Sequence, residues 1–182
     1  MSLSTGVTSS RRLIRQRIGP LTLVGLGLTL LLAGIGWLGV DRAVIGRGNL
    51  RLPDSLAGLP LSEQASGRAA LAEIERLHGK GFPLVDGAVA RYGEGALTVW
   101  VSSTWTSFLA GKQVTAMTER IAAGRSPFTP SGSRTVQGTT VFVLTGMGQT
   151  HYYFQLDRRV VWLAVSPPWA EQVLQELMHT LY

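Results

Sequence analysis

Residues 18–40 form a run of 23 residues without a charged side chain, and this run limits the architectures open to the chain. As a helix rising about 1.5 Å per residue, the run would extend for roughly 35 Å, enough to cross a hydrocarbon core of about 30 Å. Pro20 lies in the first turn, where its missing N–H is tolerated, and Trp37 lies near the far end, where an indole suits a lipid–water interface. The run therefore predicts a transmembrane helix.

Two other interpretations of this run compete with a retained anchor. A cleaved signal peptide has an apolar core of about 7–15 residues, which is shorter than residues 18–40, and no small-x-small cleavage site follows residue 40. A buried helix of a soluble core is rarely this long and free of charge. We therefore expect an uncleaved signal anchor.

The charge next to the run predicts its orientation. Four arginines precede the run within eight residues, whereas only Arg42 and Arg47 follow it within the same distance. Basic residues favour the cytoplasmic side, so we expect a cytoplasmic N-terminus and an extracytoplasmic C-terminal domain at the plasma membrane. The four membrane-flanking residues are Arg11, Arg12, Arg15 and Arg17.

The positive net charge belongs to the first part of the chain. Residues 1–50 contain six arginines and one aspartate, which gives +5, whereas residues 51–182 contain eleven basic and ten acidic residues, which gives +1. Basic residues beside an apolar span are attracted to anionic headgroups, so the lipid bilayer is an expected partner. The nearly neutral remainder has no basic stripe, and we expect no binding of nucleic acid.

The chain is expected to have four segments: a basic tail, the transmembrane helix, a linker broken by glycine and proline, and one α+β domain. About 120 residues can bury a core without a disulfide or a metal, and the sequence contains no cysteine. The four ranges are residues 1–17, 18–40, 41–61 and 62–182.

Hydrophobic periodicity predicts three helices in the domain. The first begins near Ser62, a good N-cap residue, and the second covers residues 106–123. The last follows Ser166 and Pro167 and continues to the end of the chain.

The same pattern predicts an antiparallel sheet of about five strands. Residues 93–96 form the turn of one hairpin, and short turns separate three further apolar and aromatic runs. Residues 134–136 are a candidate for a short additional strand. The predicted fold class is α+β, with about three helices packed on one face of the sheet. The predicted strands are residues 88–92, 97–102, 139–145, 150–156 and 159–165.

One strand carries the most distinctive candidate for a ligand face. His151, Tyr153 and Gln155 alternate along residues 150–156, so their side chains are expected to share one side of the strand. A polar and aromatic surface of this kind can line a ligand groove, although it can also be the hydrated face of a half-buried sheet. His78 and His179 lie at the ends of predicted helices, where an imidazole suits the helix dipole.

No motif predicts catalysis, a cofactor or a metal. The three histidines do not show the spacing of metal ligands, and no phosphate-binding glycine loop or GxSxG elbow is present. Gly146-Met147-Gly148 precedes a strand rather than a helix, which excludes a dinucleotide fingerprint. We therefore expect a protein that is not an enzyme.

Small residues recur along one side of the predicted membrane helix and mark a candidate helix–helix interface. They are spaced by four, four and three positions, which would let a second helix, from the same or another protein, approach closely. These residues are Gly25, Thr29, Ala33 and Gly36.

Two classes of function fit these features. The first is a membrane-anchored, non-catalytic binding or sensing domain for a protein, a peptide or an envelope component. The second is a small accessory subunit of a larger membrane complex, held by its helix. A membrane-tethered enzyme is a third and weaker alternative.

Overall fold

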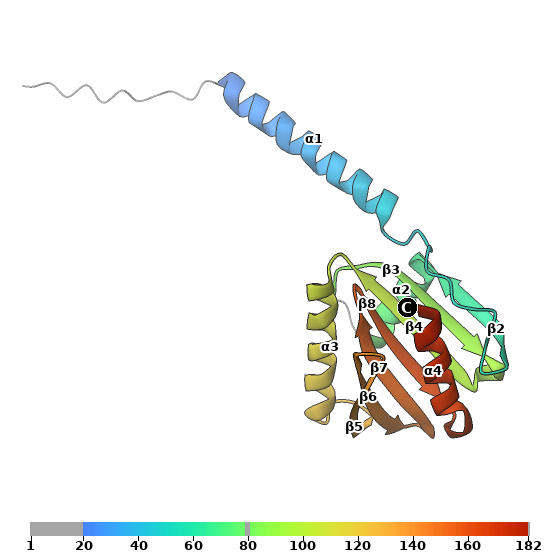
Figure 1. Cartoon of the computed structure of the whole chain (residues 1–182). Helices are drawn as coiled ribbons and strands as arrows, with labels where there is room; N and C mark the ends of the chain where they lie inside the picture. Colours follow the sequence, from blue (N-terminus) through green and yellow to red (C-terminus); the bar gives the residue numbers. More distant parts are fainter. Residues whose placement is uncertain (1–19, 79–80, 182) are drawn as a thin grey trace, which may run out of the picture. The chain divides into compact units, whose positions relative to one another are not determined.

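The computed structural model describes residues 20–78 and 81–181, in which eight strands and four α-helices are present (Figure 1). The chain divides into two compact units, Met1–Asp41 and Arg42–Tyr182. The helices are α1 (Pro20–Val44), α2 (Arg68–His78), α3 (Ser107–Ala122) and α4 (Ala170–Leu181), and short 3₁₀ turns cover Gly93–Gly95 and Pro167–Trp169. The strands are β1 (Ser55–Leu56), β2 (Leu59–Ser66), β3 (Leu84–Tyr92), β4 (Leu97–Thr104), β5 (Thr129–Val136), β6 (Thr139–Gly146), β7 (Gln149–Leu156) and β8 (Arg159–Val165).

Helix α1 contains most of the charge-free run, but it does not meet the requirements of a membrane span. Within residues 20–78 and 81–181, no helix has both the length and the apolar character that crossing a bilayer needs. The helix also includes Asp41 and Arg42. These findings contradict the predicted transmembrane anchor and the predicted single-pass placement with an extracytoplasmic domain.

The strands of the second unit form one antiparallel sheet in the order β1-β2-β3-β4-β8-β7-β6-β5. Strands that follow each other along the chain are neighbours, except that β4 pairs with β8 and thereby joins an N-terminal meander to a C-terminal one. Two-residue loops connect the C-terminal strands. In Gln137-Gly138 and Met147-Gly148 both residues have positive φ, the geometry of the type I′ turns that match the twist of a hairpin.

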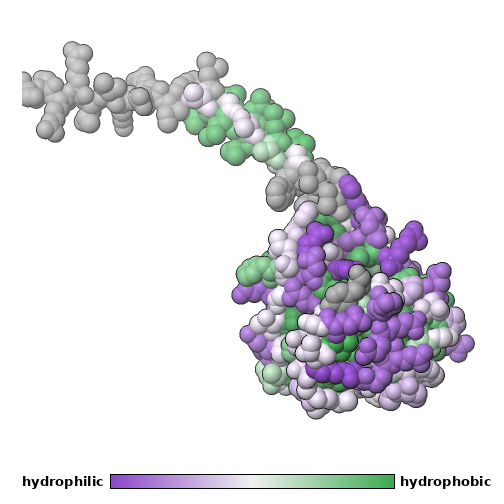
Figure 2. All heavy atoms as spheres, in the orientation of Figure 1, coloured by the Kyte–Doolittle hydropathy of each residue, from purple (hydrophilic) through white to green (hydrophobic). Residues whose placement is uncertain are grey.

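Helix α4 covers one face of this sheet, and Figure 1 shows it in front of the strands. Val173, Leu174 and Leu177 are fully buried against apolar side chains of β3, β4, β7 and β8. The 55–57 segment completes this layer, since Leu56 is buried and the backbone N–H of Ala57 donates to Glu176 Oε2 at 2.9 Å. The side of the molecule seen in Figure 2 has mainly hydrophilic residues over the domain, as expected for a closed layer.

Helices α2 and α3 cover the opposite face, each over its own part of the sheet. Helix α2 buries Ala70, Leu71 and Ile74 against β3. It lies close to the strand because position 87 is glycine: a Cβ there would lie 3.1 Å from Ile74 Cδ1 and 3.2 Å from Leu71 Cδ2. Helix α3 packs on β7 and β8. The two helices thus form two separate apolar clusters.

The structure corrects the predicted fold class in two respects. The described sheet has eight strands rather than about five, because β1 and β2 occupy part of the predicted linker and the predicted start of the first helix, while β5 begins at Thr129. Helices also cover both faces of the sheet and not one. The antiparallel pairing, the 93–96 hairpin and the final meander agree with the sequence pattern.

The segment between α1 and β1 follows the sheet edge. The carboxylate of Asp86 accepts hydrogen bonds from the backbone N–H groups of Gly48 and Asn49, at 3.1 and 3.0 Å. The hydroxyl of Tyr92 donates to the Pro53 carbonyl at 2.9 Å, and burial raises the pKa of this hydroxyl to about 12. These contacts fix a part of the predicted linker in place.

Candidate functional site

A row of aromatic side chains crosses the sheet on the face shared by α2 and α3. Strand register places Trp100 of β4 directly opposite Trp162 of β8, Trp162 opposite Tyr153 of β7, and Tyr153 opposite Phe142 of β6. Directly opposed residues of antiparallel strands point to the same side, so these four rings share one surface. The aromatic row is therefore a direct product of strand register.

Three rings of this row, Phe142, Tyr153 and Trp162, stack along the sheet. The centroids of Phe142 and Tyr153 are 4.8 Å apart, and those of Tyr153 and Trp162 are 5.4 Å apart, with interplanar angles of 12° and 15°. Phe128, from the segment after α3, is tilted against Trp162 at 5.2 Å and against His151 at 4.6 Å. Ring pairs at these distances attract each other, so each of these rings is supported by its neighbour.

A pocket of about 520 Å³ opens over this surface between α3 and the strands. Its sheet side includes Trp100, Trp162 and His151, and α3 contributes Gln113, Met117 and other residues. Apolar side chains dominate its lining. The described lining residues are Leu77, Phe82, Trp100, Gln113, Ala116, Met117, Arg120, Ile121, Arg125, Ser126, Pro127, Phe128, Met147, Gln149, His151, Trp162 and Ala164.

The hydrogen bonds of His151 define its tautomer. The indole Nε1 of Trp162 lies 3.2 Å from His151 Nδ1, and an indole N–H can only donate, so Nδ1 accepts. The proton of the neutral imidazole is then on Nε2, which donates to the Gly146 carbonyl at 3.1 Å. Both ring nitrogens of this side chain, which is only 3% exposed, are thus engaged.

Burial also keeps His151 neutral. Desolvation lowers the pKa of this imidazole, and the hydrogen bond to the Gly146 carbonyl opposes that shift only in part. A second proton on Nδ1 would moreover meet the N–H of Trp162. His151 therefore acts as a fixed link between the aromatic row and the β6–β7 turn, not as an available base or metal ligand.

Gln113 on α3 has the opposite character, since part of its side chain has no partner. Its Nε2 donates to Ser102 Oγ at 3.3 Å, and the Ser102 hydroxyl in turn donates to the Val160 carbonyl at 3.5 Å. This chain of donors leaves Gln113 Oε1 as a buried acceptor with no hydrogen bond in the described structure. The residue is 3% exposed and lines the pocket. A buried polar atom of this kind is uncommon in folded proteins.

The two charged side chains among the described lining residues are both positive. Arg120 in the last turns of α3 and Arg125 just after this helix are exposed, and the described lining contains no carboxylate. Arg120 Nε donates to the Arg125 carbonyl at 3.4 Å, and Arg125 N donates to the Arg120 carbonyl at 3.1 Å, so the two residues hold each other in place. Behind Trp100, Glu73 accepts a 3.3 Å bond from the indole, but Arg91 neutralises it with a contact of 2.6 Å.

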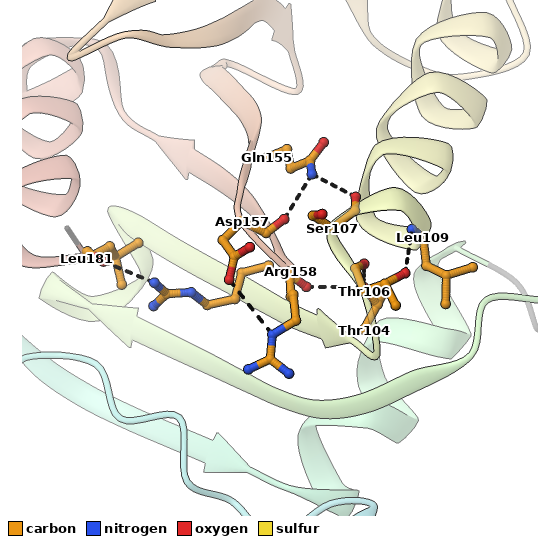
Figure 3. A network of polar contacts seen from close by, with 9 residues as sticks. Thr104, Thr106, Ser107, Leu109, Gln155, Asp157, Arg158 and Leu181 are labelled. Atoms are coloured by element: carbon orange, nitrogen blue, oxygen red, sulfur yellow. Dashed lines mark hydrogen bonds and ion pairs between the residues drawn. The ribbon is translucent and has the colours of Figure 1, made fainter.

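The three residues of the predicted ligand face share one side of β7, and only His151 lines this pocket. Tyr153 lies beneath α3, where its hydroxyl and that of Thr118 are 2.9 Å apart, and burial raises the pKa of this phenol. Gln155 belongs to a separate polar network (Figure 3). Its Nε2 donates to the carbonyls of Ser107 and Asp157, both at 2.8 Å, and thereby ties the β7–β8 turn to the start of α3.

Other candidate residues lie apart from the pocket. Gly25, Thr29, Ala33 and Gly36 are exposed on α1, and the hydroxyl of Thr29 donates to the Gly25 carbonyl at 2.9 Å within the helix. An interface at this strip stays a prediction. Arg11, Arg12, Arg15 and Arg17 lie outside the described residues. His179 is exposed in the last turn of α4, as its position in the sequence suggested.

Sequence reasoning did not identify Gln113, Trp100, Trp162 or Phe128 as site residues. Alternation along residues 97–102 does place Trp100 on one side of its strand, but only the pairing of β4 with β8 brings the two indoles together. Among the residues that the structure describes, no group of three or more His, Cys, Asp or Glu side chains could hold a metal ion. Comparisons with protein-family models, with curated proteins and with solved structures give no match for this chain.

Proposed function

We propose that the second unit of this protein is a non-catalytic binding domain, and that it takes a small molecule with an apolar body between α3 and the sheet. The observation that carries this proposal is the pocket of about 520 Å³ with its aromatic and aliphatic lining. Sites for small molecules are concave, mostly apolar cavities of about 300–1,000 Å³ with a few polar groups. The size and composition of this pocket support such a role.

The rigidity of the pocket on its sheet side supports the same role. Trp162 is held by stacking on Tyr153 and by its hydrogen bond to His151, and Trp100 by its hydrogen bond to Glu73. Side chains that are already fixed lose little conformational entropy when a ligand binds, so more of the contact energy contributes to affinity.

Exposed apolar side chains surround the pocket. Leu77 is 57% exposed and Met147 is 78% exposed, and both are lining residues. A ligand that covers this apolar surface gains about 25 cal/mol of favourable binding free energy per Å² removed from water. The flexible thioether of Met147 can adapt to ligands of different outline.

The chemistry of the lining favours binding over catalysis. His151 is the lining residue best suited to proton transfer, but both of its nitrogens are engaged and its pKa is lowered by burial. An enzyme needs a base or nucleophile placed to reach a substrate atom. Gln113, with its free amide oxygen, can orient a ligand but cannot take a proton from it at neutral pH.

Titration of the full chain with Nile red, a neutral apolar dye, tests this function. Ala116 is a half-buried lining residue on α3, so Ala116→Phe places a ring in the pocket. Ala122→Phe makes the same change at an exposed position of α3 outside the lining and is the matched control. We expect saturable dye fluorescence, a loss of affinity of about tenfold or more for Ala116→Phe, and less than about twofold for Ala122→Phe.

Equal affinity of both variants, with unchanged circular dichroism and melting temperature, would contradict binding in this pocket. An absence of saturable fluorescence with the unmodified chain would do the same.

A further inference from the structure

The residues that α3 contributes to the pocket form a stripe with a polar atom at one end and a positive charge at the other. Gln113, Met117 and Arg120 recur at spacings of four and three, so they lie on one side of the helix. Arg120 lies seven positions after Gln113, which corresponds to a rise of about 10 Å along the helix axis. Between these two ends the helix contributes the apolar lining residues Ala116 and Met117.

At the inner end, Gln113 Oε1 can accept a hydrogen bond that the described protein does not supply. The orientation of the amide is fixed by Ser102, because the serine hydroxyl is already used as a donor to Val160 and can only accept from Gln113 Nε2. A buried acceptor without a donor is costly. Oε1 itself has almost no accessible surface, so a ligand O–H or N–H group that removes this cost reaches it as the neighbouring side chains shift.

At the other end, Arg120 and Arg125 select the sign of the ligand charge. Among the residues that the structure describes, neither guanidinium forms an ion pair with a carboxylate. The aromatic rings of the pocket could also attract a cation, but a cation there would meet two arginines and no acidic lining residue. Charge complementarity therefore favours an anion, and a guanidinium pairs well with the two oxygens of a carboxylate.

We propose that the ligand of this pocket is an amphipathic carboxylate that carries a hydroxyl group at the far end of an apolar chain, as in a medium-chain hydroxy fatty acid. The carboxylate binds Arg120 and Arg125, the chain lies on Trp100, Trp162 and Met117, and the hydroxyl donates to Gln113 Oε1. This inference rests on the proposed binding function and specifies its ligand class.

Three probes of one chain length separate these contributions: 1-octanol, octanoate and 8-hydroxyoctanoate, each used to displace Nile red from the full chain. We expect octanoate to bind about tenfold more tightly than 1-octanol because of the arginines, and this advantage to shrink as salt is added. We expect 8-hydroxyoctanoate to bind about fivefold more tightly than octanoate because of Gln113.

Variants assign each preference to its residue. The double change Arg120→Gln and Arg125→Gln should abolish the preference for octanoate over 1-octanol, whereas Arg158→Gln, which removes an exposed charge at the β7–β8 turn outside the lining, should leave it intact. Gln113→Leu should abolish the preference for 8-hydroxyoctanoate over octanoate. Gln113→Glu replaces the amide with a carboxylate, which repels the carboxylate of the ligand. This variant should weaken the binding of octanoate and of 8-hydroxyoctanoate but not that of 1-octanol.

The outcomes distinguish the ligand class from the function itself. If 1-octanol and octanoate displace the dye equally, the amphipathic carboxylate is wrong although the pocket still binds apolar molecules. If either preference survives its variant, the binding mode at Arg120, Arg125 and Gln113 is wrong. If Nile red does not bind, the proposed function fails first, and the ligand class fails with it.

Discussion

The two faces of the sheet are covered differently, and the difference separates stability from binding. Helix α4 closes one face with a continuous cluster in which Val173, Leu174 and Leu177 have no exposed surface. The other face is shared by α2 and α3, whose clusters are separate and leave the half-buried Trp100 among the residues that line a pocket. Helix α4 alone covers the first face with a closed apolar layer. On the second face, residues of both α2 and α3 line the pocket that the two helices leave over the sheet.

The largest expected effect distinguishes the faces by their packing. Leu177→Ala removes a fully buried side chain under α4 and should lower the free energy of unfolding by about 3 kcal/mol, since the cavity has no solvent access. Met117→Ala, at the wall of the pocket, should lower it by about 1 kcal/mol, because the new space joins a space that is already open. Urea denaturation of both variants measures this difference, and equal losses would contradict the contrast between the faces.

The second prediction concerns the pH dependence of stability, because a different titrating side chain lies on each face of the sheet. His151 is held neutral by burial, so below the unfolded pKa of about 6.5 the unfolded chain binds a proton that the folded one does not. Stability should therefore fall as pH decreases from about 6.5 towards the lowered folded pKa, by at most about 1.4 kcal/mol per pH unit. His151→Phe should remove this component, which is measured as the difference in the pH dependence of urea unfolding between variant and wild type.

On the α4 face the corresponding titration lies at lower pH. Hydrogen bonds from Arg134, at 2.8 and 2.7 Å, lower the pKa of Glu171 below its ordinary value of about 4.5. The stability contributed by this exposed pair is present above the unfolded pKa and is lost as pH falls through the folded one. Glu171→Gln removes this contribution, so it should lower stability by a constant amount at pH values well above about 4.5 and change the slope of stability against pH only below about 4.5. A changed slope near pH 6 in that variant, or an unchanged slope there in His151→Phe, would contradict the assignment.

The smallest expected effect compares two neighbouring tyrosines on opposite faces. Tyr152 donates to Glu171 Oε1 at 3.0 Å on the α4 side, and the Tyr153 hydroxyl pairs with that of Thr118 at 2.9 Å on the α3 side. Replacing either tyrosine with phenylalanine removes one hydrogen bond and should cost about 1 kcal/mol, somewhat more for Tyr152 because its acceptor is charged. Thermal unfolding of the two variants measures both, and a loss of more than about 3 kcal/mol for either would mean that the ring packing had also changed.

The sequence predicted the elements that depend on local chemistry. The C-terminal meander follows from apolar runs interrupted by short turns, and Met147 and Gly148 form one of these turns, with positive φ at both residues. Helix α3 has Thr106 as its N-cap residue, with its hydroxyl accepting from Leu109 N at 3.3 Å. Such signals act within a few residues and can be read without the partner strands.

The elements that sequence reasoning missed depend on partners far along the chain. Strand β2 contains Pro60 and several polar residues, and it forms by pairing with β3 about 25 residues later. A proline is accepted near a sheet edge, so it did not exclude a strand there. The pocket needs residues of α2, α3, β4, β7 and β8 together, and no spacing in the sequence indicates that Gln113 faces Ser102.

The most direct test of the binding site observes the tryptophan side chains individually. We propose to record the indole N–H resonances of the full chain by ¹⁵N NMR, assigned by single Trp→Phe changes, while 8-hydroxyoctanoate is added. Binding in the pocket predicts large shifts for Trp100 and Trp162, which line it, and none for Trp105 and Trp169, which do not. Shifts at Trp105 or Trp169 with Trp100 and Trp162 unchanged would contradict the account.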